Sequence, residues 1–344
     1  MAAPWLVTVG GFLGAGKTSL ILAAGRALSR RGLRSAAILN DQGEDLVDTG
    51  LVGRSMPADQ VSGGCFCCRF SDLLQAADRL AAHAPEVIFA EPVGSCTDLS
   101  ATILQPLARD FPGRFRLAPL TIVIDPEFAG SPMSHDVAFL FRNQLAEADL
   151  ICFSKCDLDI EAPDLPASAP VRFTSALTGE GVDAWLDEVL SGDLRAGNTT
   201  LNIDYDRYAR AEAAMSWLNR RVRLELVDAL SPAAIAGPLL DGILEQLELR
   251  SVPVLHCKLL NTTESGYVKA AVTGSSREPV VEGQLDASPA LHHDILLNLR
   301  SSGEPALVAE IVETEMARVL GVRISDTSAS FRPLPPKPER RITI

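Results

Sequence analysis

The sequence contains no apolar run that approaches the roughly 20 residues of a membrane-spanning helix, so we expect no membrane partner. Basic residues are in the minority: 31 lysines and arginines face 44 acidic residues, which gives a formal net charge of −13. Because nucleic acid binds to a basic surface, this balance argues against nucleic acid as a main partner. The N-terminus has no basic segment before its first apolar run, so we expect no signal peptide.

Histidine is scarce, and the cysteines are odd in number. The chain has five histidines and seven cysteines, and three of the cysteines stand in the segment Cys65-Phe66-Cys67-Cys68. A clustered, odd set is typical of metal-binding or catalytic thiols in a reducing cytoplasm rather than of a disulfide framework. The remaining composition, 47% hydrophobic and 22% charged, is that of a globular protein, and 344 residues suggest about two domains.

The segment from Gly11 to Thr18 has the spacing of a phosphate-binding loop. It follows an apolar run over 5–9 and precedes a helical pattern that ends at Gly32. Glycines leave the backbone N–H groups free to surround a phosphate, and the following helix adds its positive end. We expect Lys17 to reach the outer phosphates and the Thr18 hydroxyl to bind Mg²⁺. The predicted nucleotide contacts here are Gly11, Gly14, Ala15, Gly16, Lys17, Thr18 and Ser19.

Apolar runs alternate with helical patterns through the first half of the chain. The predicted strands after the first are 35–39, 57–61, 87–90, 120–124, 150–153 and 171–173. Nearly continuous apolar strands separated by helices predict an α/β domain, a P-loop NTPase fold whose mostly parallel sheet is covered by helices on both faces. Ligands of such sheets bind beyond the C-terminal ends of the strands, where the polar motifs of this sequence fall.

We place the domain boundary in a segment rich in Gly, Asn, Thr and Asp. The predicted division is a P-loop domain over 1–190, a linker over 191–204, a small α+β domain over 205–330 and an extended, mobile, Pro-rich tail over 331–344. In the second domain we expect a sheet with two helices on one face. Its predicted helices are 211–217, 232–247 and 306–320, and its predicted strands are 222–227, 252–260, 267–272 and 296–299.

The segment Ser154-Lys155-Cys156-Asp157 follows one of the predicted strands. A carboxylate at Asp157 can accept two N–H bonds from the edge of guanine, for which adenine has no matching pair of donors. The stem of Lys155 can lie along the base, and the backbone N–H groups of Ser175 and Ala176, after the next strand, can add to the contact. The motif predicts GTP and argues against the main alternative, a P-loop kinase or another ATP-using transferase.

Together these motifs resemble the CobW-type GTPases, relatives of the HypB and UreG metal-insertion GTPases. Three further stretches carry the resemblance, which extends over about residues 5–190. The segment 40–44 with Asp48 is similar to the first switch of the family, 64–68 matches its Cys-x-Cys-Cys motif, and 91–94 matches its Glu-x-x-Gly motif. The second domain resembles the family only loosely.

The resemblance implies roles for residues near the nucleotide. It assigns Asp48 to Mg²⁺ and to the organisation of water, places Glu91 beside the metal and the γ-phosphate, and suggests that the Gly94 N–H responds to the γ-phosphate. Carboxylates suit this task because Mg²⁺ prefers oxygen ligands and keeps several waters that carboxylates can hold. Lys17, Asp48 and Glu91 are therefore the candidate catalytic residues, with a solvated surface acid as the alternative for either carboxylate.

The thiols of Cys65, Cys67 and Cys68 suit Zn²⁺ or another transition metal. Three ligands do not close a tetrahedral site, so a fourth must come from elsewhere. Glu44 is the candidate, and a water or a ligand from a client protein are the alternatives. We interpret the other nearby cysteines as packed thiols, namely Cys96 and Cys156.

Three features depart from the family pattern, and the first is that Pro92 and Val93 stand where small hydroxyl residues are often found. The chain lacks the histidine-rich run that many relatives carry, which argues against bulk metal storage, and Ser154 stands where Asn is commoner. The leading interpretation is a cytoplasmic GTP-binding and GTP-hydrolysing chaperone that delivers zinc or another transition metal, or assists a metallocofactor enzyme. The implied partners are GTP and GDP, a client metalloprotein and a second copy in a nucleotide-dependent homodimer. The alternatives are a repair chaperone for a corrinoid-dependent enzyme and a non-catalytic, metal-responsive regulator.

Overall fold

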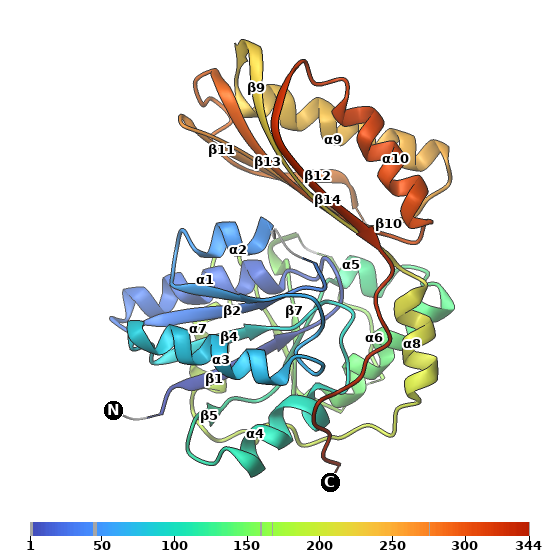
Figure 1. Ribbon diagram of the computed structural model, residues 1–344. Helices are drawn as coiled ribbons and strands as arrows, with labels where there is room; N and C mark the ends of the chain where they lie inside the picture. The colour runs from blue at the N-terminus through green and yellow to red at the C-terminus, as the bar shows by residue number, and fades with distance from the viewer. Residues whose placement is uncertain (1–2, 44–46, 159, 167, 275, 344) are drawn as a thin grey trace. The chain divides into compact units, whose positions relative to one another are not determined.

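The computed structural model describes residues 3–43, 47–158, 160–166, 168–274 and 276–343 (Figure 1). The chain divides into two compact units, which are described separately below. The first unit contains Met1–Gln42, Asp48–Glu212 and Leu334–Ile344, and the second contains Gly43–Val47 and Ala213–Pro333. The C-terminal segment thus returns to the first unit.

A parallel sheet forms the centre of the first unit. Its strands are β1 (Trp5–Gly10), β2 (Ser35–Asn40), β3 (Ala58–Val61), β4 (Val87–Glu91), β6 (Thr121–Ile124), β7 (Leu150–Phe153) and β8 (Val171–Phe173). Their order is β3-β2-β4-β1-β6-β7-β8, and a short strand, β5 (Arg116–Leu117), pairs with β1. Every pairing is parallel, which confirms the predicted α/β class.

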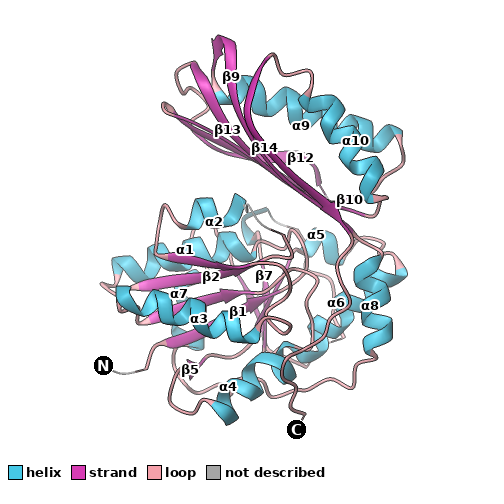
Figure 2. Cartoon of the chain, viewed as in Figure 1, coloured by secondary structure: helices cyan, strands magenta, loops and turns pink. Residues whose placement is uncertain are grey.

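Helices lie on both sides of this sheet (Figure 2). They are α1 (Lys17–Arg30), α2 (Val47–Val52), α3 (Phe70–Leu80), α4 (Gln105–Asp110), α5 (Pro126–Ala129), α6 (His135–Glu147), α7 (Val182–Val189) and α8 (Tyr205–Ala213). The apolar stripe of α1, including Leu20 and Leu28, packs with Trp185 of α7 against Val7 and Val9 of β1. Burial of this stripe is the force that holds α1, and therefore the loop before it, against the sheet.

The second unit is a six-stranded antiparallel sheet in the order β12-β11-β10-β13-β9-β14. The strands are β9 (Ser216–Leu230), β10 (Val254–Thr263), β11 (Gly266–Thr273), β12 (Ser276–Gly283), β13 (Ala290–Ser301) and β14 (Gly321–Phe331). Two helices, α9 (Pro232–Leu249) and α10 (Pro305–Met316), pack on one face, as predicted (Figure 1). Their buried residues, such as Leu239 and Ile311, share one core with Leu259 and Leu297 of the sheet.

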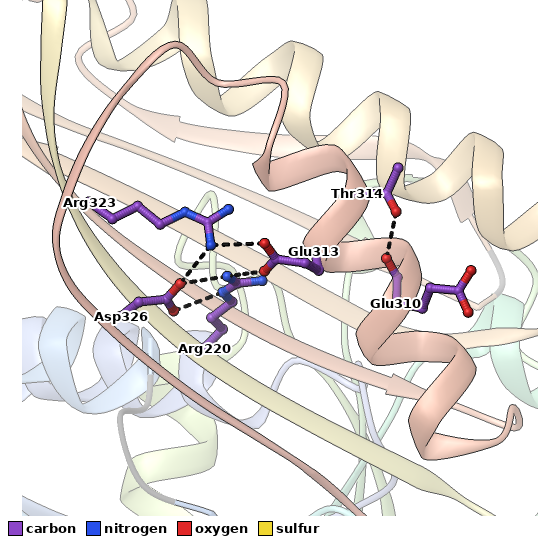
Figure 3. Close-up of polar contacts among 6 residues, drawn as sticks. All are labelled: Arg220, Glu310, Glu313, Thr314, Arg323 and Asp326. Atoms are coloured by element: carbon purple, nitrogen blue, oxygen red, sulfur yellow. Dashed lines mark hydrogen bonds and ion pairs between the residues drawn. The ribbon is translucent and has the colours of Figure 1, made fainter.

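A network of ion pairs ties helix α10 to two strands of the second sheet (Figure 3). The Arg220 guanidinium, on β9, reaches Glu313 of α10 and Asp326 of β14, and the Arg323 guanidinium bonds to the same two carboxylates. Burial opposes ionisation of Glu313, but its hydrogen bonds from Arg220 and Arg323 dominate and lower its pKa. The side chain of Arg220 is almost fully buried, so this network holds β14 as the outer strand of the sheet.

One predicted helix is wrong. The alanine-rich pattern over 211–217 predicted a helix, but α8 ends at Ala213 and strand β9 begins at Ser216. Trp217 is fully buried in the strand, where it pairs with Arg300 of β13 and Phe331 of β14. Pairing with two neighbouring strands outweighs the local helix preference of the alanines. Within the described part of the chain, no helix has the length and apolar character needed to cross a membrane.

Candidate functional site

The phosphate-binding loop joins the end of β1 to the start of α1. Gly11 has φ +130°, and a Cβ on it would lie 2.2 Å from the carbonyl oxygen of Val123, so only glycine fits there. Gly14 and Gly16 also have positive φ, at 80° and 94°. Helix α1 starts at Lys17, whose ammonium lies within the loop and donates to the carbonyls of Gly11 (2.9 Å) and Phe12 (3.1 Å). This backbone can surround a phosphate.

The next helical residue, Thr18, meets the carboxylate that ends β4. Thr18 Oγ1 donates to Glu91 Oε1 at 3.0 Å, and both residues are buried. Oxygen donors of this kind are the ligands and water-holding groups that Mg²⁺ prefers, so these two residues fit the ion. Asp48 lies in the first turn of α2 and is half-buried. The structure therefore brings Thr18 and Glu91 together as the sequence predicted, while the magnesium roles of all three residues stay predictions.

Gly94 packs directly against the phosphate-binding loop. A Cβ on Gly94 would lie 2.8 Å from Leu13 Cδ2 and 3.0 Å from the Leu13 backbone nitrogen. The Gln144 amide, fully buried on α6, donates to the carbonyl of Gly94 at 3.0 Å and to that of Cys96 at 2.8 Å. The Cys96 N–H donates to the Val93 carbonyl at 2.9 Å, which closes a tight turn. The turn over residues 93–96 is thus a compact body held between the loop and α6.

The predicted base-binding motif lies at the end of β7, at the same edge of the sheet as the phosphate-binding loop. Lys155 adopts φ +58°, and its ammonium bonds to Asp125 Oδ2 at 2.7 Å, while the Asp157 side chain is exposed. Ser154 lies against the phosphate loop, since a Cβ on Gly16 would be 3.6 Å from the Ser154 side chain. Asp125 was missed by sequence reasoning, although its position directly after a buried strand matched that of the other motif residues.

Of the two backbone N–H groups predicted to contact the base, those of Ser175 and Ala176, the first is already hydrogen-bonded within the protein. The Ser175 N–H already donates to the Glu180 carbonyl at 2.9 Å, and the Ala176 carbonyl accepts a bond from Arg26 at 3.2 Å. Ala176 is therefore the better candidate for an N–H contact with the base. Phe173, which ends β8, is 53% exposed and stacks on Phe153 at 5.6 Å between ring centroids, so an aromatic face is also available at this edge.

The three clustered cysteines form a compact group of thiols between β3 and α3. Their sulfurs all lie within 4.8 Å of one another: Cys65 and Cys68 are 3.3 Å apart, and Cys67 and Cys68 are 3.7 Å apart. Zn–S bonds of about 2.3 Å in a tetrahedral site separate neighbouring sulfurs by roughly 3.7 Å, so the group fits an ion of this class. The structure thus brings together all three cysteines that the sequence predicted.

The thiols differ in acidity. Interactions with Cys67, Cys68 and Cys96 hold the pKa of Cys65 well below its usual value, even though burial opposes this shift. The same interaction with Cys65 raises the pKa of Cys67, and it raises that of Cys68 to about 11. Cys65 is therefore the most acidic thiol of the group, and the thiolate is the form that ligates metals.

Asn40, the last residue of β2, holds the loop that carries these thiols. Its amide group donates to the carbonyls of Val61 (2.9 Å) and Gly64 (2.8 Å), and its amide oxygen accepts from the Phe66 N–H at 2.8 Å. Asn40 is also the first residue of the predicted first switch. Sequence reasoning placed it in that switch but did not find its contacts with the cysteine loop. Glu44, the predicted fourth ligand, lies outside the described residues.

A pocket of about 300 Å³ opens beside the thiols. Cys65 and Cys68 line it on one side, and Glu212 and Leu334 to Lys337 line it elsewhere. Glu212 is 2% exposed, and burial raises its pKa to about 8. The pocket gives an ion a route to the thiols, and it places a protonated carboxylic acid in the wall of that route.

The C-terminal tail forms part of this wall. The Lys337 N–H donates to Cys68 Sγ at 3.0 Å, and the Glu339 N–H donates to the Cys67 carbonyl at 2.8 Å. The Glu339 carboxylate accepts from the Ser71 N–H (3.0 Å) and hydroxyl (2.7 Å) and so caps the start of α3. The tail is extended, as predicted. It forms these hydrogen bonds with the first unit, however, whereas the sequence predicted a mobile tail (Figure 1).

Three solved structures resemble the chain at low identity. Zn(II)-bound YjiA GTPase from E. coli is 15% identical, and the match covers 93% of this chain and 99% of that chain at a TM-score of 0.36. HypB from Helicobacter pylori in complex with nickel is 14% identical, with 58% and 91% covered at a TM-score of 0.42. HypB from Archaeoglobus fulgidus is 20% identical, with 54% and 87% covered at a TM-score of 0.37. Likeness at these scores identifies no function.

A model of a sequence family matches part of the first unit. Residues 5–168 match the CobW/HypB/UreG nucleotide-binding domain. That range begins with β1 and includes the glycine loop, the cysteine group, the segment 91–94 and the predicted base-binding motif at the end of β7. Over residues 5–168, just under half of the chain, the first unit is therefore similar to the nucleotide-binding domain of the CobW/HypB/UreG family.

Proposed function

We propose that the protein is a GTP-binding and GTP-hydrolysing chaperone that carries zinc or another transition metal on Cys65, Cys67 and Cys68. The observation that carries this proposal is the position of Asn40. One side chain joins the end of β2, where the predicted first switch begins, to the loop that holds three thiols. A nucleotide-dependent change at the switch would therefore act on the metal-binding loop.

The nucleotide half of the proposal assigns one task to each group. The loop from Gly11 to Ser19 holds the phosphates, and Lys17 neutralises charge on the outer ones. Thr18, Asp48 and Glu91 would hold Mg²⁺, which supplies charge neutralisation during hydrolysis. Gly94 reports the γ-phosphate through its N–H, and Asp157 selects guanine. Hydrolysis needs positioning and electrostatic stabilisation rather than a covalent intermediate, which suits this set of residues.

The metal is cargo in this proposal. The thiols bind it through the pocket, and an opening beside a binding site suits exchange with a client protein better than permanent storage does. Loading and release require that the affinity for metal differ between the GTP and GDP states, and linkage then requires that metal change the affinity for nucleotide by the same factor. The client is a metalloprotein, with a corrinoid-dependent enzyme as the alternative, and a nucleotide-dependent homodimer in the cytoplasm remains part of the proposal.

The test compares three purified proteins: the wild type, the Cys65, Cys67, Cys68 triple serine variant and Lys17→Ala. We expect about one equivalent of zinc on the wild type and on Lys17→Ala, and none on the triple variant. We expect GTP turnover by the wild type and a loss of 100-fold or more, on the order seen for removal of one transition-state donor, in Lys17→Ala. Wild-type protein without metal would refute the chaperone role. Metal binding without turnover would favour the non-catalytic regulator.

A further inference from the structure

The C-terminal tail brings one backbone donor to the clustered thiols. Residues 335–338 have the sequence Pro-Pro-Lys-Pro, and proline has no N–H group and favours an extended backbone. Lys337 therefore carries the single backbone N–H group that these four residues can offer. That N–H donates to Cys68 Sγ at 3.0 Å. The prolines thus leave one donor in this stretch, and the structure directs it at a thiol.

The tail also contacts the backbone of the loop that carries the thiols. The Glu339 N–H donates to the Cys67 carbonyl at 2.8 Å. Residues 334–337 line the pocket together with Cys65 and Cys68. The tail and the thiol loop both belong to the first unit, so these contacts lie within one compact body. The tail therefore approaches the thiols from the side on which the pocket opens.

Beyond the thiols, the tail is anchored by charged groups. The Arg341 guanidinium bonds to Asp98 Oδ2 at 2.7 Å, and Asp98 is fully buried. The Ile342 N–H donates to the Ala101 carbonyl at 2.8 Å. Removing the partner of a buried charge is costly, so the pair of Arg341 and Asp98 keeps this end of the tail docked. The extended segment before it is then held beside the thiols.

We propose that Lys337 is a positioning residue of the metal site: its backbone N–H orients Cys68 Sγ, and residues 335–341 close over the bound metal as a strap. The inference rests on the proposed function. A thiol that binds a metal gives up its proton, and a charged sulfur accepts a stronger hydrogen bond than a neutral one. Groups that bond to a metal ligand fix its orientation and strengthen metal binding. Metal binding and tail docking therefore stabilise each other by the same factor.

The first measurement uses the wild-type full chain and does not depend on how a variant folds. The sequence contains five lysines, so selective ¹⁵N-lysine labelling gives a simple NMR spectrum, in which Lys337→Ala identifies the Lys337 signal. We expect hydrogen exchange of this N–H to slow by about 5- to 10-fold when one equivalent of zinc binds, because the bond to a charged acceptor is stronger. Equal exchange rates in zinc-free and zinc-loaded protein would overturn the inference and leave the proposed function intact. A wild type that binds no zinc would overturn the proposed function itself.

The second measurement compares Lys337→Pro with Lys337→Ala as the matched control. Lys337→Pro removes the N–H and keeps the extended backbone that the neighbouring prolines favour, whereas Lys337→Ala removes the side chain and keeps the N–H. In competition with a chromophoric chelator, Lys337→Pro should bind zinc about 10- to 100-fold more weakly, the usual cost of losing a group that orients a metal ligand. Lys337→Ala should bind zinc like the wild type, and both zinc-free variants should bind GDP like the wild type. Equal zinc affinities of Lys337→Pro and the wild type would contradict the inference.

Discussion

At the scale of single residues, the site is built from side chains whose surroundings decide their chemistry. The Lys17 ammonium lies among loop carbonyls, the Thr18 hydroxyl bonds to Glu91, and Cys65 becomes the most acidic thiol because its neighbours bond to it. Asp157 stays exposed at a strand end, where a base can reach it. Each of these environments can be tested by one substitution.

The selection of guanine is assigned to Asp157. Replacing it by asparagine in Asp157→Asn removes one of two acceptors and the negative charge, so the preference for GTP over ATP should fall by about 10- to 100-fold. Competition of unlabelled nucleotides against a fluorescent GDP measures the preference. Cys156→Ser, one residue earlier in the same loop, should keep it. An unchanged preference in Asp157→Asn would show that other groups read the base.

The buried carboxyl group of Glu147 should make the stability of the first unit depend on pH. This carboxyl is fully buried on α6, where it accepts from the Thr97 hydroxyl and the Ser100 N–H, and burial raises its pKa to about 8. Between about pH 4.5 and 8 the folded protein keeps a proton that the unfolded chain has lost, so the free energy of unfolding should fall as pH rises, by up to about 1.4 kcal/mol per pH unit. Urea unfolding of the wild type and Glu147→Gln at several pH values checks this. The variant should have the shallower slope, and equal slopes would contradict the assignment.

At the scale of elements, the cysteine loop and the tail are held by contacts that are distant in sequence. Asn40, at the end of β2, holds the loop through side-chain hydrogen bonds, and the tail forms hydrogen bonds with Cys67, Cys68 and Ser71. The Arg341 guanidinium anchors the tail further along by bonding to Asp98 Oδ2 at 2.7 Å. These contacts make the geometry of the thiols depend on the end of β2 and on the tail.

Asn40→Asp should loosen the cysteine loop. The aspartate keeps an acceptor for the Phe66 N–H but loses both donors to carbonyls, and it places a negative charge beside them. Zinc affinity should fall by about 10- to 100-fold, the usual cost of losing a group that orients a metal ligand. Asn143→Asp, an asparagine on α6 that bonds within its own helix, is the control. Unchanged zinc affinity in a folded Asn40→Asp protein would remove the proposed link between β2 and the thiols.

Glu339→Ala should destabilise the start of α3. The Glu339 carboxylate supplies a capping bond that no residue next to the helix provides, since Arg69 at the cap position makes no side-chain cap. Loss of such a cap costs about 1 kcal/mol, which urea unfolding can measure. Lys337→Ala should cost little, because Lys337 contacts Cys68 through its backbone N–H. Equal stability of both variants and the wild type would mean that the tail does not support α3.

Sequence patterns predicted those elements whose local and tertiary preferences agree. The β1 strand, the glycine loop and the α1 helix were predicted because strand period, positive-φ glycines and an apolar helical stripe all favour the same structure. The helix predicted over 211–217 was wrong because the pairing of Trp217 with a neighbouring strand outweighs the helix propensity of this segment. The roles of Gln144, Glu212 and the tail depend on contacts between residues far apart in the chain, and a single sequence holds no record of such contacts.

At the scale of the whole molecule, one compact unit contains both the segment that is similar to a nucleotide-binding domain and the group of thiols, and a separate antiparallel sheet follows. The central claim is that nucleotide and metal binding are coupled within the first unit through Asn40. The Asn40 side chain bonds to the loop that carries the thiols, and Asn40 is also the residue at which the predicted first switch begins. Coupling through this residue must appear as a difference in metal affinity between the two nucleotide states.

Isothermal titration of zinc into the full chain, saturated first with GDP and then with a non-hydrolysable GTP analogue, tests this claim most directly. We predict dissociation constants that differ by about 5- to 150-fold between the two states, the usual range of allosteric coupling. Titrating each nucleotide into zinc-free and zinc-loaded protein should return the same factor. Identical zinc affinities in the two nucleotide states would contradict the account.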